Sequence, residues 1–174
     1  MSLRISSTDT QMLPYKGLRP YEEEDRENFF GRDADCRILI DKILANRVTL
    51  LFAASGVGKS SLLQAKVLPQ LNDPQHENLD TVYYRDWVLS PLPTLKQHIL
   101  ATLKDRKRLA GDALIEETKE DSLEDFFALC AFVSRQPLVI ALDQFEEFFH
   151  NQRYAPDFKP FIDCLLYTSD AADE

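Results

Sequence analysis

The chain has 174 residues, of which 44% are hydrophobic and 28% charged. This length suits one domain with its own core, and the composition excludes a disordered, collagen-like or disulfide-dense protein. The net charge of −9 argues against a general nucleic-acid or membrane-surface binder, because phosphate groups attract cationic surfaces. No apolar run approaches the roughly 18 residues that span a bilayer, and no signal peptide is evident. Three isolated cysteines indicate reduced thiols, so we expect a cytoplasmic protein.

The first half of the chain alternates helical and strand-like patterns. Residues 1–13 are polar and aperiodic, and we expect a flexible tail there. An acidic stretch over 21–28 suggests a helical turn, and apolar spacing over 33–44 predicts a helix with Asp33 as its N-cap. The unbroken apolar run VTLLF at 48–52 predicts a strand buried on both faces of a parallel sheet. A Gly/Ser turn follows, and then a helix over residues 59–68.

The second half repeats this alternation. It predicts a strand within 81–88 stopped by Pro91 and Pro93, a helix capped by Thr94, a helix capped by Ser122 with Asp125, a strand over 138–142, and helices from 145 and 157. Strands that alternate with helices predict an α/β fold with a mainly parallel sheet. The single tryptophan, Trp87, and the cysteines Cys36 and Cys130 fit core positions. A basic run, Lys104 and residues 106–108, fits a solvated helix end better than a nucleic-acid site.

Residues 53–60, AASGVGKS, match a phosphate-binding loop read as [AG]-x4-G-K-[ST]. Gly56 and Gly58 leave room for backbone N–H groups to approach phosphates and permit the φ angles of the turn. Lys59 would contact the β and γ phosphates, and the Ser60 hydroxyl would bind Mg²⁺. The alternative is a Gly-rich turn between a strand and a helix with an exposed lysine.

A carboxylate follows the apolar strand predicted over 138–142. In a phosphate-binding site Asp143 would hold the magnesium shell, and Glu146 or Glu147 would activate the attacking water. The alternative for Asp143 is a helix N-cap. For the two glutamates it is a favourable contact with the dipole of the following helix.

Four motifs occur in order: PYKGLRPY at 14–21, FFGR at 29–32, SGVGKSS at 55–61 and LDQFEEFF at 142–149. Together they resemble the novel STAND NTPases, signal-transduction ATPases related to AAA+ proteins. The resemblance implies a P-loop NTPase fold with three layers, α-β-α, and ATP and Mg²⁺ as cofactors. It implies a conformational switch in a bacterial, multidomain protein that self-associates and carries downstream WD or other repeats for protein partners.

The resemblance also implies roles for particular residues. Nucleotide-binding residues would be Gly31, Arg32, Ser55, Gly56, Val57, Gly58, Lys59, Ser60 and Ser61. The metal-binding residues would be Ser60 and Asp143, and the catalytic residues Lys59, Glu146 and Glu147. Two alternatives to a slow ATPase switch are a non-hydrolysing, nucleotide-dependent assembly scaffold and an AAA+-like loader of nucleic-acid machinery, which the acidic charge disfavours.

The last eleven residues, 164–174, resemble the translated read-through of a DNA-sequencing adapter. We therefore interpret them as non-native, although a short acidic terminus is the alternative. Without their three carboxylates the net charge of −9 becomes −6. The NTPase domain would then span 14–163 and lack the strand that the resemblance places between the P-loop strand and the strand over 138–142. A missing central strand leaves unpaired backbone groups, so we expect an unstable chain without efficient turnover.

Overall fold

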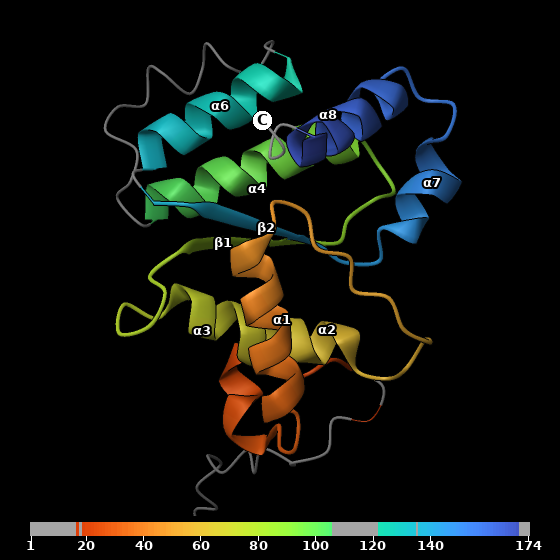
Figure 1. Cartoon of the computed structure of the whole chain (residues 1–174). Coiled ribbons are helices and arrows are strands. Elements are labelled where there is room, and N and C mark those ends of the chain that lie inside the picture. The colour runs from red at the N-terminus through yellow and green to blue at the C-terminus, as the bar shows by residue number, and fades with distance from the viewer. Residues whose placement is uncertain (1–16, 18, 106–121, 135, 171–174) are drawn as a thin grey trace, which may run out of the picture.

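The computed structural model describes residues 17, 19–105, 122–134 and 136–170 (Figure 1). The flexible tail expected over 1–13 and the basic residues 106–108 lie outside this part of the chain. Within it, the fold is α/β with a small parallel sheet. Strand β1 (Asp80–Tyr84) pairs in parallel with β2 (Leu138–Leu142), and Tyr83 stands opposite Ala141 in the register. The prediction for β2 is confirmed at both ends.

Helices cover both faces of this sheet (Figure 1). One face carries α4 (Pro91–Asp105), α6 (Leu123–Ser134) and α8 (Phe158–Asp170). The other carries α1 (Asp33–Ala45) and a continuous helix made of α2 (Lys59–Leu62), a π-helical turn (Leu63–Val67) and α3 (Leu68–Asn72). A 3-10 helix (Glu23–Asn28) precedes α1, and α7 (Glu146–Gln152) precedes α8. Of the expected P-loop sheet, only these two strands form among the described residues.

The alternation of side chains along the strands divides the hydrophobic core in two. Val82 and Tyr84 belong to a buried cluster with α4, α6 and α8, whereas Tyr83 packs against a second cluster built on α1 and the helix that follows the P-loop. Successive side chains of a strand point to opposite faces, so one short strand pair anchors both layers. Trp87, Cys36 and Cys130 are buried, which confirms their predicted core positions.

The segment over 48–52 contradicts its prediction, because it is not a strand and has no strand partner among the described residues. Leu50 and Phe52 are 89% and 96% exposed, respectively, rather than buried. A strand is held by hydrogen bonds to a neighbour, and apolar composition alone cannot supply them. The segment is instead irregular chain that connects α1 to α2 (Figure 1).

Two predicted helix starts are also wrong. Helix α1 has Arg32, not Asp33, at its N-cap position, and Asp33 instead pairs with Lys66. Helix α4 begins at Pro91 and includes Pro93, because a proline in the first turn loses no helical hydrogen bond. Thr94 lies inside that helix and donates its hydroxyl proton to the Ser90 carbonyl.

The cap predicted for α6 is confirmed. The Ser122 hydroxyl accepts the Asp125 N–H at 3.2 Å and donates to the Asp125 carboxylate at 2.7 Å. Helix α8 runs to Asp170 and buries Cys164, so residues 164–170 form part of a helix. The interpretation of 164–174 as non-native stays a prediction.

Aromatic rings join α7 and α8 to the end of the sheet. Phe148 is 1% exposed, stacks on Phe145 and Phe158, and contacts Trp87 and Phe161 edge-on. Such ring pairs add stability beyond the burial of their area. This cluster fixes the position of α7, and therefore of the two glutamates in its first turn.

Truncation of Phe148 tests this anchor. We expect Phe148→Ala to lower the free energy of unfolding by about 3–5 kcal/mol, because it leaves a cavity among packed rings. Phe149→Ala is the matched control, since Phe149 is 45% exposed and its loss should cost about 1 kcal/mol or less. Urea unfolding followed by circular dichroism measures both, and equal losses would contradict a buried anchor at residue 148.

Candidate functional site

The Gly-rich loop at 53–58 leads directly into α2. Gly56 and Gly58 have φ angles of +80° and +83°, a region that side chains with a Cβ rarely adopt. The first helical hydrogen bond joins the Leu62 N–H to the Gly58 carbonyl at 2.9 Å. The N–H groups of the loop and of the first helical turn have no backbone acceptor among the described residues, and they are the donors that a phosphate chain needs.

Lys59 is held within this loop. Its ammonium donates to the Ala53 carbonyl at 2.9 Å and to the Ala54 carbonyl at 3.1 Å. These acceptors are neutral, so a phosphate anion at the loop would attract the ammonium more strongly, because both partners of the hydrogen bond would then be charged. Lys59 is therefore placed to exchange loop carbonyls for phosphate oxygens.

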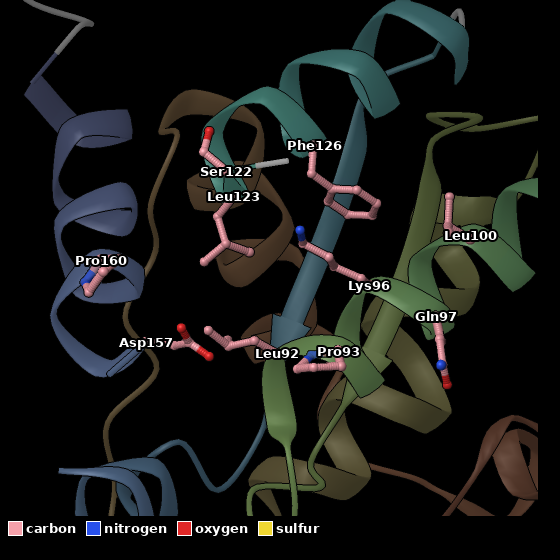
Figure 2. Close-up of a pocket in the computed structure, with 10 residues that line it drawn as sticks. All are labelled: Leu92, Pro93, Lys96, Gln97, Leu100, Ser122, Leu123, Phe126, Asp157 and Pro160. Atoms are coloured by element: carbon pink, nitrogen blue, oxygen red, sulfur yellow. The ribbon is translucent and has the colours of Figure 1, made fainter. Parts of the chain in front are cut away.

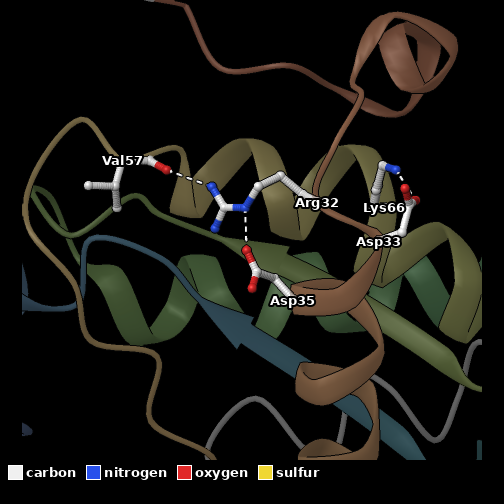
Figure 3. A network of polar contacts seen from close by, with 5 residues as sticks. All are labelled: Arg32, Asp33, Asp35, Val57 and Lys66. Carbon is white, nitrogen blue, oxygen red and sulfur yellow. Dashed lines mark hydrogen bonds and ion pairs between the residues drawn. The ribbon is translucent and has the colours of Figure 1, made fainter.

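Arg32 ties the region before α1 to the loop (Figure 3). Its guanidinium donates to the Val57 carbonyl at 2.9 Å and also pairs with Asp35. A Cβ added at Gly58 would lie 3.8 Å from the same guanidinium. The motif around Gly31 thus meets the phosphate-binding loop in space although 25 residues separate Arg32 from Val57.

A short ion pair between Lys66 and Asp33 lies next to this contact (Figure 3). The hydrogen bond from Lys66 is the main reason that the pKa of Asp33 falls below its usual value. The pair joins the helix after the loop to the start of α1, so two contacts fix α1 against the loop and its helix.

Asp143 connects the end of β2 to the loop helix. The Ser60 hydroxyl donates to Asp143 Oδ2 at 2.6 Å, and the Tyr83 hydroxyl donates to the same oxygen, also at 2.6 Å. Asp143 is 7% exposed, and its backbone N–H extends the strand ladder to the Tyr84 carbonyl. Its own carbonyl accepts the Trp87 indole N–H at 2.7 Å. Ser60 and Asp143, predicted to meet, are thus in direct contact.

Tyr83 had no predicted role in the site. Burial is the main cause that raises its pKa well above the usual value, and the hydrogen bond to the Asp143 carboxylate acts in the same direction. The phenol is therefore a neutral donor throughout the physiological range. The sequence carries no clear signal for this role, because a tyrosine inside a strand has the pattern of a core residue.

The acidic pair follows a strained turn. Gln144 has a φ angle of +53°, an uncommon conformation for a residue other than glycine, and its carbonyl accepts the Glu147 N–H at 2.9 Å. Glu146 is exposed and Glu147 is half-buried at the start of α7. The turn brings both close to Asp143 in the chain, but neither carboxylate accepts a hydrogen bond from the described residues.

The remaining predicted nucleotide-binding residues are on or near the loop. Ser55, Gly56 and Val57 are exposed at its tip, and Gly31 has a φ angle of +79° before α1. The Ser61 hydroxyl is buried and accepts the Tyr21 N–H at 3.0 Å, which ties the lead-in segment to the helix.

The donor set at Ser60 and Asp143 fits a magnesium ion. Mg²⁺ prefers hard oxygen ligands and binds through one or two protein groups together with water and phosphate oxygens. A serine hydroxyl and a carboxylate at the edge of a phosphate-binding loop have that chemistry. Within the described ranges, no group of three His, Cys, Asp or Glu side chains forms a metal site of the all-protein kind.

A separate pocket of about 450 Å³ lies between α4, α6 and α8 (Figure 2). Its lining is mostly apolar, with Leu92, Leu123 and Phe126 inside and Lys96 and Asp157 as its charged groups. These helices cover the sheet face opposite α2, so the pocket is not part of the site at Ser60 (Figure 1).

A glycine-rich loop with a lysine, joined through a serine to an aspartate at a strand end, is the arrangement typical of P-loop NTPases. The family model for Novel STAND NTPase 1 matches residues 14–174, and the chain belongs to this family. Searches of curated proteins and of solved structures found no match. No helix in the described part of the chain has the length and hydrophobicity to cross a bilayer.

The Arg32 contact can be tested by hydrogen exchange. Loss of one hydrogen bond to the loop costs about 0.5–1.5 kcal/mol, so Arg32→Ala should raise amide exchange over residues 53–58 by roughly 2- to 10-fold. Arg37→Ala removes an exposed arginine from α1, the helix that Arg32 precedes, and serves as the control. Unchanged exchange in Arg32→Ala would show that the loop does not depend on this guanidinium.

Proposed function

We propose that this chain is the nucleotide-binding part of a signalling ATPase that binds Mg-ATP and, in a longer protein, hydrolyses it slowly as a conformational switch. The observation that carries the proposal is the 2.6 Å hydrogen bond between Ser60 and Asp143. It joins a phosphate-binding loop to a strand-end carboxylate 83 residues away, the pairing that magnesium-nucleotide binding requires. Membership in the STAND NTPase family supports the same function.

The residues of the loop would bind the phosphates. Backbone N–H groups around Gly56 and Gly58 would surround them, and Lys59 would leave the Ala53 and Ala54 carbonyls to neutralise their charge. Ser60 and Asp143 would hold Mg²⁺, whose charge, when it is bound, polarises the phosphoryl group. Arg32 would keep the loop close to α1 beside the nucleotide.

Glu146 and Glu147 would supply the base that orients and deprotonates the attacking water. Both carboxylates are at the start of α7, two and three residues after the strained Gln144. Neither carboxylate accepts a hydrogen bond within the part of the chain that the structure describes, so each would be available to a water molecule.

The second candidate function is a nucleotide-dependent assembly scaffold without turnover. It is favoured by the segment over 48–52, which precedes the loop and remains outside the sheet. A loop without a strand behind it is less rigid, and phosphoryl transfer depends on rigid positioning. The proposal also includes self-association, downstream repeats and protein partners, which rest on the family resemblance. It includes a cytoplasmic location, which rests on the isolated cysteines.

Nucleotide binding is tested by thermal unfolding with and without Mg-ATP. At a ligand concentration 100 times the dissociation constant, binding adds about 2.7 kcal/mol and should raise Tm by about 5–10 °C. Lys59→Ala should abolish this shift. Lys66→Ala is the matched control on the same helix, and it should lower Tm without removing the shift, because Lys66 pairs with Asp33. An equal shift in Lys59→Ala would contradict binding at the loop.

Hydrolysis separates the two candidate functions. In the longer protein, Glu146→Gln combined with Glu147→Gln should lower ATP turnover by about 10²- to 10⁴-fold and leave nucleotide affinity unchanged, because only the base is lost. Release of inorganic phosphate measures the turnover. Absence of turnover in the unsubstituted protein, with Mg-ATP still bound, would favour the scaffold, and unchanged turnover in the variant would remove these glutamates from the chemistry.

A further inference from the structure

The geometry points to Tyr83 as a positioning residue for the magnesium site, acting through Asp143. Its hydroxyl holds the Asp143 carboxylate in one orientation, so that the affinity for Mg²⁺ in the nucleotide complex depends on Tyr83. This inference rests on the proposed function, because it assigns a further residue to the same Mg-nucleotide site. Tyr83 itself touches neither nucleotide nor metal in this role.

The contacts at Asp143 are asymmetric. Tyr83 and Ser60 both donate to Oδ2 at 2.6 Å, and Oδ1 receives no hydrogen bond from the described residues. A hydroxyl has one proton, so each donor uses it on Oδ2. The lone pairs of the Ser60 oxygen and of Oδ1 are therefore free to face a cation or its water. Two anchors on one oxygen fix the direction in which the other oxygen points.

The strand register places Tyr83 for this role. Tyr83 stands opposite Ala141, and Asp143 follows two residues later, one step beyond the end of β2, on the same sheet face. The small side chain of Ala141 leaves space beside it for the tyrosine ring to extend toward the strand end. A longer side chain at 141 would compete with the ring for that position. The contact is thus set by backbone pairing between two strands.

The hydrogen bond from Tyr83 to Asp143 has two opposing effects on the affinity for Mg²⁺. The phenol draws negative charge from the carboxylate, which weakens its attraction for Mg²⁺. It also holds the carboxylate in place, so that less conformational entropy is lost when Mg²⁺ binds. In metal sites, loss of the groups that hydrogen-bond the ligands typically costs 10- to 100-fold in metal affinity, so orientation dominates. We therefore expect the Tyr83 hydroxyl to strengthen magnesium binding.

The neighbouring residue offers a matched control. Tyr84 also carries a buried hydroxyl, but it points to the other face, where its oxygen lies 2.5 Å from the Asp86 carbonyl and 2.7 Å from the Pro91 carbonyl and shares its one proton between them. Tyr84→Phe and Tyr83→Phe each remove one hydroxyl oxygen from adjacent positions of the same strand. Only the second removes a contact with Asp143.

The experiment measures the affinity of the full chain for ATP with excess Mg²⁺ and with EDTA, by isothermal titration calorimetry, and takes the ratio of the two. Changes in the fluorescence of Trp87, the single tryptophan, provide a second readout, because its indole donates to the Asp143 carbonyl. We expect Tyr83→Phe to reduce the ratio of the ATP affinity in Mg²⁺ to the ATP affinity in EDTA about tenfold, and to leave the ATP affinity in EDTA unchanged. Tyr84→Phe should leave the ratio unchanged.

A further variant tests the route of the effect. In an Asp143→Asn background, Tyr83→Phe should change the ratio no further, since the carboxylate through which Tyr83 acts is absent. An additional tenfold loss there would overturn the assignment. An unchanged ratio in Tyr83→Phe alone would also overturn it. Loss of the folded state in Tyr83→Phe would do the same, because the hydroxyl would then be assigned to folding. If the unsubstituted chain shows no Mg²⁺-dependent ATP binding, both this inference and the proposed function fail, whereas failure of Tyr83 alone leaves the function standing.

Discussion

The parallel pairing of β1 with β2 is the constraint on which the rest of the structure depends. Its register places Tyr83 and Tyr84 on opposite faces, and each tyrosine joins a different hydrophobic cluster. The ladder continues one step beyond the strand, through the Asp143 N–H and the Tyr84 carbonyl. The carboxylate is thereby held at the end of a hydrogen-bonded strand rather than on a loop. Both the packing of the helices and the chemistry of the site follow from these few backbone contacts.

The phosphate-binding loop is stabilised by groups that a ligand would have to displace or join. Lys59 satisfies loop carbonyls, Arg32 holds the Val57 carbonyl, and Ser60 is bound to Asp143. In each contact, a group of the protein supplies part of the electrostatic attraction that phosphate or metal would provide. These contacts define the conformation of the loop in the absence of a ligand, and binding must break those that Lys59 and Ser60 make.

Several features of the fold and site were predictable because their causes are local. The bounds of β2 and the Ser122 cap follow from strand composition and capping chemistry. The contact between Ser60 and Asp143 spans 83 residues, and it was predictable for another reason, because both motifs were assigned to one magnesium site. The segment over 48–52 was not predictable, since a strand also needs a partner and the sequence of a segment does not reveal whether one is beside it. Tyr83 was missed for a related reason. Its role depends on which residue stands opposite it, which is a property of the register alone.

The π-helical turn between α2 and α3 has a consequence for how this site can vary. Leu62 and Val67 are both buried in one cluster although they are five residues apart, a spacing that a regular α-helix would place on different sides. The extra residue in this turn therefore determines how α2 is rotated about the helix axis relative to α3, whose buried residues are anchored in the core. Removal of one residue from the turn would rotate Ser60 by about 100° around the helix axis and direct its hydroxyl away from Asp143. A change in the length of this turn would therefore alter the contact between Ser60 and Asp143, while the buried residues of α3 would keep their positions.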